Sequence, residues 1–123
     1  HWDVKGLFKG EVLKFDVKGK KKVNRADANS QDEIAWIEGT NVWGKPGWIK
    51  GKADYIVFER NDYWLVVDRK ELYNHVVQKV KENGVQQGRG IYKVYQRAGR
   101  QDKITMVPFD NIEKLINIHK VQK

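Results

Sequence analysis

The sequence contains no cysteine, only two prolines and a single methionine in 123 residues. Without cysteine the chain has no disulfide framework, no thiolate metal site and no cysteine nucleophile. The same absence is typical of proteins in a reducing compartment, so we expect a cytoplasmic protein. No apolar run approaches the roughly 20 residues of a membrane span, and no signal-peptide core is visible, so we expect no membrane partner.

Length and composition predict one soluble domain. A chain of 123 residues falls within the usual size of a single domain and is long enough to bury a hydrophobic core. Apolar residues make up 40% and charged residues 33% of the chain, as in soluble globular proteins. We therefore expect residues 1–123 to form a single domain. Because the first residue is His1 and the one methionine is Met106, we also expect a fragment or a processed form.

The charge is positive overall and unevenly distributed. The net charge is +8. Residues 1–26 carry eight basic and three acidic side chains, residues 69–123 carry twelve and five, and the middle segment, residues 27–68, carries four and eight. Two cationic segments around an acidic one favour a polyanionic partner such as nucleic acid. A basic protein whose charge serves solubility alone is the alternative.

Hydrophobic alternation and turn residues predict a chain rich in strands. Residues 1–19 alternate well, and we expect two antiparallel strands there, joined by a turn at residues 5–10. Aromatic and β-branched residues predict a hairpin of strands 53–59 and 63–67. Single strands are expected at residues 33–41, 91–96 and 103–107.

Two capping patterns predict helices. Asp68 precedes Glu71 by three residues, as in a capping box. Apolar residues then follow at helical spacing as far as the Asn-Gly pair at 83–84, which is typical of a helix end. Asp110 and Glu113 repeat the pattern before the last apolar stretch and predict a short terminal helix. The expected fold is a mixed α/β, or α+β, single domain.

Two aspartates and a lysine form the most informative pattern. Asp3 is followed, after twelve residues, by Asp16-Val17-Lys18. Because side chains alternate along a strand, Asp16 and Lys18 share one face, and we expect Val17 to enter the core. A hairpin brings Asp3 of the neighbouring strand onto the same polar face. The sequence therefore predicts two carboxylates and one ammonium at a sheet edge. Chance alternation on a solvated strand is the alternative.

This group of side chains suits a hard divalent cation. Neighbouring carboxylates repel each other, and a cation between them relieves the repulsion. Mg²⁺ prefers oxygen ligands and is often held by one or two carboxylates together with substrate phosphates. It would polarise a phosphodiester and lower the pKa of its bound water, while Lys18 would orient that water or stabilise the transition state. The expected cofactor is Mg²⁺, with Mn²⁺ as a substitute.

The same residues resemble a known signature. Asp3, Asp16 and Lys18 resemble the motif of the PD-(D/E)XK, or restriction-endonuclease-like, nucleases. Trp2 stands before Asp3 where that motif has proline. Later segments are similar to small phage-encoded members, so the resemblance spans nearly the whole chain: Trp36-Ile37-Glu38-Gly39-Thr40-Asn41, Gly47-Trp48, Lys52-Ala53-Asp54-Tyr55 and Arg97-x2-Arg100-Gln101-Asp102.

The resemblance implies a central mixed β-sheet flanked by helices and Mg²⁺-dependent cleavage of DNA. Asp3 matches the first metal-binding acid, Asp16 the second, with aspartate in place of the commoner glutamate, and Lys18 the catalytic lysine. The helix that normally precedes the first strand of the family is expected to be missing here. Such enzymes often act as dimers, which leaves a homodimer open. A phage-encoded member would act in the cytoplasm of the host cell.

Other polar residues are candidates for the edge of the site. Glu38 would ligate or approach the metal and Asn41 would bind a phosphate oxygen, although a rim carboxylate and a strand-end turn explain them equally well. Asp54 is expected to cap a short turn. Two basic sets would hold the nucleic-acid backbone, or else form solvated surface: Lys20, Lys21, Lys22, Arg25 in a polar loop and Lys93, Arg97, Arg100 further on.

Four of the five tryptophans follow recognisable patterns. Trp36 and Trp64 lie within expected strands, so we expect them in the core. Trp43 and Trp48 flank a turn that contains glycine and proline, and we expect them to be partly exposed. Exposed aromatic rings beside basic residues stack on unpaired bases, but plain packing is the alternative.

Three functions are compatible with these observations. The first is a metal-dependent DNA endonuclease that uses Asp3, Asp16 and Lys18 and an Mg²⁺-bound water. The second is a non-catalytic nucleic-acid-binding module, which explains the charge but not why two acids lie beside a basic face. The third is a basic structural or assembly protein. Metal-dependent cleavage separates the first from the other two.

Overall fold

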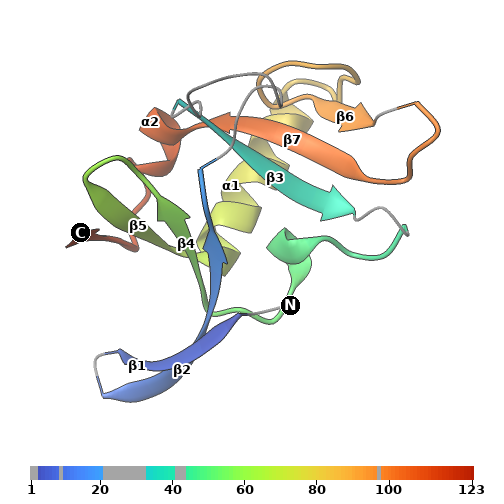
Figure 1. Ribbon diagram of the computed structural model, residues 1–123. Helices are drawn as coiled ribbons and strands as arrows, with labels where there is room; N and C mark the ends of the chain where they lie inside the picture. The colour runs from blue at the N-terminus through green and yellow to red at the C-terminus, as the bar shows by residue number, and fades with distance from the viewer. Residues whose placement is uncertain (1–2, 9, 21–32, 41–43, 97) are drawn as a thin grey trace.

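A computed structural model of the chain describes residues 3–8, 10–20, 33–40, 44–96 and 98–123 (Figure 1). The structure is a small domain of mixed α/β type in which strands predominate. Its elements follow one another as β1 (Val4–Phe8), β2 (Glu11–Lys18), β3 (Ile34–Thr40), the 3-10 helix η1 (Trp48–Lys50), β4 (Tyr55–Glu59), β5 (Tyr63–Asp68), α1 (Arg69–Glu82), β6 (Val94–Gln96), β7 (Lys103–Pro108), α2 (Phe109–Ile112) and β8 (Ile118–Gln122).

The strands form two sheets. The larger has five strands in the order β1-β2-β4-β5-β8, and the smaller has three in the order β3-β7-β6. The larger sheet is mixed, because β2 runs parallel to β4 whereas its other neighbouring strands pair antiparallel. The predicted mixed sheet is therefore present, and the second sheet is an addition that the sequence did not predict.

The hydrophobic core lies where α1 and the smaller sheet meet one face of the larger sheet. That face carries Ile56 and Phe58 of β4, which pair with Val67 and Leu65 of β5. Leu72 of α1 packs into the same cluster, as do Ala35, Ile37 and Val107 of the smaller sheet. Figure 1 shows α1 behind β3 and between the two sheets. The core thus joins residues from both halves of the chain.

The first predicted helix is confirmed. It spans Arg69–Glu82, and the Asp68 side chain accepts a hydrogen bond of 2.9 Å from the backbone N–H of Glu71, as expected for an N-cap. The Glu71 carboxylate accepts hydrogen bonds from the backbone N–H groups of Ile116 and Asn117 instead of reaching back to the cap. This acid therefore ties the start of α1 to the turn that precedes β8.

The predicted terminal helix is wrong. The helix α2 ends at Ile112 and begins directly after Pro108, which stands at its N-cap position. Residues Ile118–Gln122 form β8, which pairs antiparallel with β5. The local capping pattern was a weaker influence than the free edge of β5, whose backbone groups gain partners when β8 pairs with it.

The two faces of β2 are reversed relative to the prediction. Asp16 has an exposed fraction of 0%, whereas Val17 is 38% exposed. In the parallel register Asp16 pairs with Ile56, so its side chain lies on the face that bears the core, and Val17 lies on the opposite face with Val57. On that opposite face Phe15 stacks on Tyr55, with ring centroids 5.9 Å apart. Alternation was predicted correctly, but not which face the rest of the chain covers.

Candidate functional site

Asp3 and Asp16 are neighbours across the β1–β2 hairpin. Val4 pairs with Phe15, so the preceding residue, Asp3, lies beside Asp16. The backbone N–H of Asp3 donates to the carbonyl of Phe15 at 2.8 Å, and Oδ2 of Asp3 accepts from the backbone N–H of Val17 at 2.9 Å. These two hydrogen bonds fix Asp3 against β2. The sequence-based expectation that a hairpin unites the two acids is therefore met.

Lys18 completes the group from the same strand. It lies two residues beyond Asp16, and its ammonium Nζ is 3.2 Å from Oδ1 of Asp16. The lysine side chain is 21% exposed, so the ion pair is closed to water on the Asp16 side and open on the Lys18 side. Two carboxylates and one ammonium thus meet near the end of the β1–β2 pair, Asp3 from the residue before β1 and Asp16 and Lys18 from β2.

Trp48 also lies beside the Lys18 ammonium. Nζ is 4.8 Å from the centre of the Trp48 ring, a distance at which the ring face attracts a cation. Trp48 belongs to η1, which packs on β3, and it is buried rather than partly exposed as predicted. Gly47 makes this approach possible, because a Cβ there would lie 2.2 Å from the carbonyl oxygen of Glu38. The sequence did not predict this contact, although the Gly47-Trp48 pair marks the place of the close approach.

The two carboxyl groups have opposite pKa shifts. Burial raises the pKa of Asp16 to about 6, and the hydrogen bond with Asp3 adds to that rise, whereas the charge of Lys18 opposes it. The hydrogen bond from the backbone of Val17 lowers the pKa of Asp3, while its partial burial acts against this change. At neutral pH Asp3 is ionised and Asp16 is close to its titration range. Below that range the two acids share one proton.

The donor set fits a hard cation. Asp3 and Asp16 offer carboxylate oxygens as ligands. Once the proton has left, a cation between the two carboxylates relieves their mutual repulsion. Mg²⁺ often takes only one or two protein carboxylates and completes its shell with water and phosphate oxygens. Within the part of the chain that the structure describes, no group of three or more His, Cys, Asp or Glu side chains forms a metal cage. Asp3 and Asp16 therefore suit a cation shared with a substrate.

The other predicted site residues are less concentrated. Glu38 is half-buried on β3 and touches the Gly47 turn rather than forming a three-acid group with Asp3 and Asp16. Its role in the site stays a prediction, and Asn41 lies outside the described residues. Asp54 does not cap a turn: its Oδ2 accepts from the backbone N–H of Lys14 at 2.8 Å, which links β4 to β2.

The described basic residues lie in several places. Lys20 donates its ammonium to the side chain of Asn61 in the β4–β5 turn. Lys93 is half-buried just before β6, and Arg100 is exposed in the turn between β6 and β7, where its carbonyl accepts from Gln96 at 2.8 Å. Lys21, Lys22, Arg25 and Arg97 lie outside the described residues. Their contacts with nucleic acid stay predictions.

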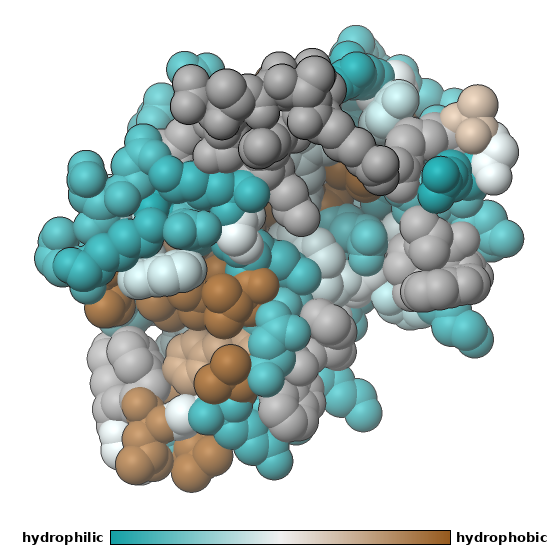
Figure 2. Space-filling view, in the orientation of Figure 1, coloured by the Kyte–Doolittle hydropathy of each residue, from teal (hydrophilic) through white to brown (hydrophobic). Residues whose placement is uncertain are grey.

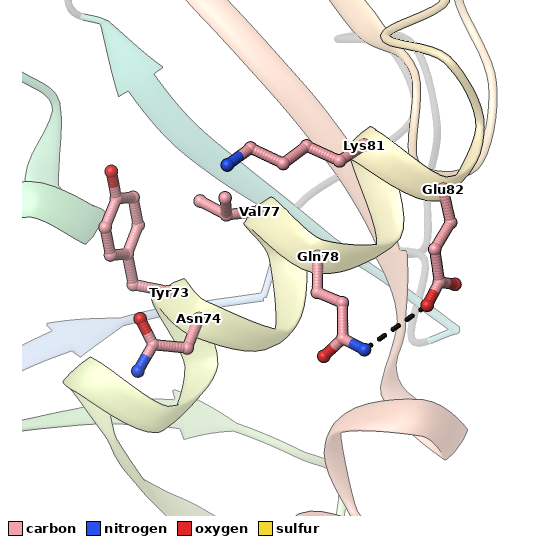
Figure 3. A pocket seen from close by; sticks show the side chains of 6 residues that line it. All are labelled: Tyr73, Asn74, Val77, Gln78, Lys81 and Glu82. Carbon is pink, nitrogen blue, oxygen red and sulfur yellow. Dashed lines mark hydrogen bonds between the residues drawn. The ribbon is translucent and has the colours of Figure 1, made fainter.

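A hollow on the outer side of α1 is a poor alternative site. It is shallow, and its only acid is Glu82, which accepts a hydrogen bond of 3.3 Å from Gln78 and pairs with Lys79 at 3.6 Å (Figure 3). All of the lining residues come from this one helix: Tyr73, Asn74, Val77, Gln78, Lys81 and Glu82. Side chains from different elements do not converge there, as they do around Asp16.

Comparison with known proteins gives no family and no relative. No protein family, curated protein or solved structure matches this chain. Among the described residues, no helix has the length and apolar character needed to cross a bilayer. Function is therefore inferred from the geometry and chemistry of the site itself.

Proposed function

We propose that this protein is a metal-dependent endonuclease that hydrolyses phosphodiester bonds in DNA. The observation that supports it best is the meeting of Asp3, Asp16 and Lys18 at one end of the β1–β2 pair, with Asp16 removed from water. An acid with a raised pKa beside a second acid opposes folding at neutral pH, and such arrangements are concentrated at functional sites. We further propose that the mixed sheet belongs to the restriction-endonuclease-like fold.

Asp3 and Asp16 would hold Mg²⁺ in this enzyme. Asp3 is ionised because the Val17 N–H stabilises its charge, and Asp16 becomes a full ligand when its proton leaves. The cation, when bound, neutralises charge at the phosphate and makes water more acidic. Asp16 lies on β2, and Asp3 directly precedes β1 and is hydrogen-bonded to β2, so backbone contacts fix the spacing of the two acids.

Lys18 would act on the phosphate. Its ammonium contacts both Asp16 and the Trp48 ring, so it is oriented before a substrate arrives. Hydrolysis joins the oxygen of a water to phosphorus and breaks the bond from phosphorus to one sugar oxygen. One proton of that water ends on the departing sugar oxygen. Lys18 would stabilise the negative charge that grows on the phosphate oxygens during this exchange.

A non-catalytic nucleic-acid-binding module is the alternative. The net charge of +8 supports binding to a polyanion equally well. A binding surface alone gives no reason to keep Asp3 and Asp16 together, since both acids repel a phosphate. The cysteine-free sequence favours action in the cytoplasm, which is that of the host cell for a phage protein.

The test is cleavage of supercoiled plasmid and of branched DNA, with Mg²⁺ or Mn²⁺ and with EDTA. We expect nicking that needs the metal and that falls at least a hundredfold in Asp16→Asn and in Lys18→Ala, a loss typical of a removed electrostatic group. DNA binding should persist in both variants. Asp110→Asn and Lys114→Ala, which change exposed residues of α2 and the turn after it, serve as matched controls. Equal cleavage by wild type and Asp16→Asn would reject the proposal.

A further inference from the structure

The β1–β2 hairpin extends beyond the sheet to which it belongs. β2 pairs with β4 only from Phe15 to Lys18, and within the described structure β1 pairs with β2 alone. Residues 5–8 and 10–14, which we call the hairpin arm, therefore project from the body, as Figure 1 shows at its lower left. A two-stranded ribbon that leaves its sheet exposes both of its faces.

The base of the hairpin arm is anchored. The backbone N–H of Lys14 donates to Oδ2 of Asp54 at 2.8 Å, and the backbone N–H of Asp54 donates to the carbonyl of Lys14 at 2.8 Å. The next residue of β2, Phe15, already pairs with β4. These contacts fix the direction in which the arm leaves the body, so its position relative to Asp16 is set before any partner binds.

One face of the hairpin arm continues the candidate site. Lys14 lies two residues before Asp16 on the same face, about 7 Å away along the strand. Lys5 pairs with Lys14 across the hairpin, and Leu7 pairs with Val12 nearer the tip. Leu7 is 78% exposed and Val12 is 70% exposed. From the site outward, this face therefore presents two acids, then two lysines, then an apolar pair.

The order of these side chains matches a nucleic-acid backbone. Phosphates repeat at every nucleotide, so a strand whose scissile phosphate lies at Asp3 and Asp16 carries its next phosphate toward the lysine pair. Lys5 and Lys14 pair across the hairpin, so both ammonium groups can contact the same stretch of backbone. In Figure 2 hydrophobic side chains gather over the projecting hairpin and the adjacent sheet, which gives the arm an apolar part to pack against sugars and bases.

We propose that the hairpin arm binds duplex DNA beside the cleavage site. Lys5 and Lys14 hold phosphates next to the scissile one, and Leu7 and Val12 pack into a groove. This inference rests on the proposed function for its placement of the scissile phosphate. Duplex DNA is favoured because its major groove accepts a two-stranded ribbon, whereas the major groove of A-form RNA is too narrow for side chains to read.

A second copy of the chain fits the same face less well. A stable dimer needs about 800 Å² of buried surface on each partner, which one exposed Leu–Val pair does not supply. In a two-fold contact through this face, the lysine pair would also approach the lysine pair of the other copy. Charge complementarity therefore favours a polyanion.

The test is the salt dependence of binding to a labelled DNA duplex, measured by fluorescence anisotropy in the Asp16→Asn background, which removes cleavage. Replacing Lys5 and Lys14 by Gln should reduce the slope of log K against log [salt] by about 1.8, or 0.9 for each lost phosphate contact. Between 50 and 200 mM salt, affinity in the parent should therefore fall about tenfold more than in the variant. Replacing Leu7 and Val12 by Gln should weaken binding at every salt concentration without changing the slope.

Matched controls make the result specific. Lys81→Gln with Lys114→Gln removes the same charge from exposed positions on α1 and after α2. An equal loss of slope in this pair would overturn the proposal, because the effect would come from net charge alone. Equal competition by duplex RNA would overturn the assignment to DNA. A change from dimer to monomer in the Leu7 and Val12 variant, with DNA binding intact, would also overturn it.

The inference and the proposed function fail in different ways. In one outcome, the salt slope of the Lys5 and Lys14 variant is unchanged while the wild type cleaves plasmid in a metal-dependent way. That result would reject the hairpin arm as a DNA-binding element and leave the nuclease proposal standing. A selective loss of slope in a protein that does not cleave DNA rejects the nuclease and supports the arm as a binding element.

Discussion

Two acidic side chains, Asp16 and Glu113, are drawn away from water in different parts of the molecule, and their pKa values move in opposite directions. Each lies 3.2 Å from a lysine ammonium. In each case the lysine also lies near an aromatic ring, that of Trp48 in one place and Tyr63 in the other. The cation and the ring are common to both sites, so neither accounts for the difference.

Glu113 has several donors around its carboxylate. Burial raises its pKa, but a hydrogen bond from the Tyr63 hydroxyl and the charges of Lys120 and Arg60 outweigh burial and lower the pKa overall. One oxygen accepts from Tyr63, and the other lies 3.5 Å from the Arg60 guanidinium. Arg60 in turn packs over the ring of Phe109, 4.1 Å from its centre. This acid is stabilised in its charged form and joins β5, α2 and β8.

Asp16 has one ammonium and a second acid beside it. Burial is the largest influence on its pKa, and its hydrogen bond with Asp3 raises the pKa further. Its charged form is therefore poorly stabilised by the chain alone. The comparison shows that the surroundings of Glu113 favour its charged form, as expected for a structural acid, whereas those of Asp16, the proposed metal ligand, favour its neutral form.

The largest expected effect is the stabilisation of the fold by Asp16→Asn. The folded chain keeps the Asp16 proton up to a pH of about 6, whereas an unfolded aspartate releases it near 3.8. The folded state thus binds more protons in this window, and stability falls as the pH rises through it. Removing the charge should raise the unfolding free energy at pH 8 by on the order of 2–3 kcal/mol. Urea unfolding at pH 4 and pH 8 measures the change.

Magnesium gives an independent measure of the same group. In the wild type at pH 8, Mg²⁺ at a hundredfold excess over its Kd should stabilise the fold by about 2.7 kcal/mol. The gain should shrink at pH 5, where the Asp16 proton competes, and it should vanish in Asp16→Asn. Asp110→Asn serves as the control and should respond to Mg²⁺ as the wild type does. A magnesium effect in Asp16→Asn equal to that of the wild type would contradict the assignment.

Glu113→Gln should have the opposite sign. The pKa of Glu113 is lowered in the folded state, so its contribution is present above the ordinary value of 4.5 and is lost as the pH falls below it. The amide keeps an acceptor for Tyr63 but loses its attraction to Lys120 and Arg60. We expect a loss of about 1–2 kcal/mol at pH 8 and little difference from the wild type in acid. Stabilisation of this variant at pH 8 would remove the contrast with Asp16.

Sequence patterns predicted the local hairpins and α1 better than they predicted which face of a strand is buried. The β1–β2 hairpin, the β4–β5 hairpin and α1 are confirmed, because each depends on local turn and capping residues. The turn of the first hairpin was predicted too early, since residues 5–8 belong to β1. The terminal helix was wrong, since β8 forms only through its pairing with β5, to which it is joined by about 50 residues of chain. Long-range pairing of this kind leaves no local signal.

The candidate site was predicted only in part, because part of it also depends on long-range contacts. Alternation placed Asp16 and Lys18 on one face, which the structure confirms. It also suggested that Val17 enters the core, because a hydrophobic residue is normally the buried one. The reverse occurs because the face of β2 that bears Asp16 is the face covered by the rest of the fold. Trp48 was missed as a partner of Lys18, since it approaches from a segment about 30 residues later in the chain.

Asp54 is a third acid to compare with Asp16 and Glu113, and its removal should have a smaller effect on stability. Its carboxylate accepts a hydrogen bond from the backbone N–H of Lys14 and is exposed. Asp54→Ala should cost about 1 kcal/mol and should speed amide exchange at Lys14, because the base of the hairpin arm loses its anchor. Asp54→Asn keeps an acceptor oxygen and should restore most of the protection. Equal exchange at Lys14 in the alanine variant and the wild type would show that the arm is held by other contacts.

The smallest expected effect concerns the Trp48 ring beside Lys18. Phenylalanine attracts a cation less strongly than tryptophan, so Trp48→Phe should lower kcat for DNA cleavage about threefold to fivefold, equivalent to a loss of 0.5–1 kcal/mol in the transition state. KM should stay unchanged if the ring acts only by orienting the Lys18 ammonium. Ile49→Val, in the same 3-10 helix and also buried, provides the control for loosened packing. It should lower stability by about 1 kcal/mol and leave kcat intact. An equal fall of kcat in both variants would mean that Trp48, which is part of the hydrophobic core, supports the site by packing alone.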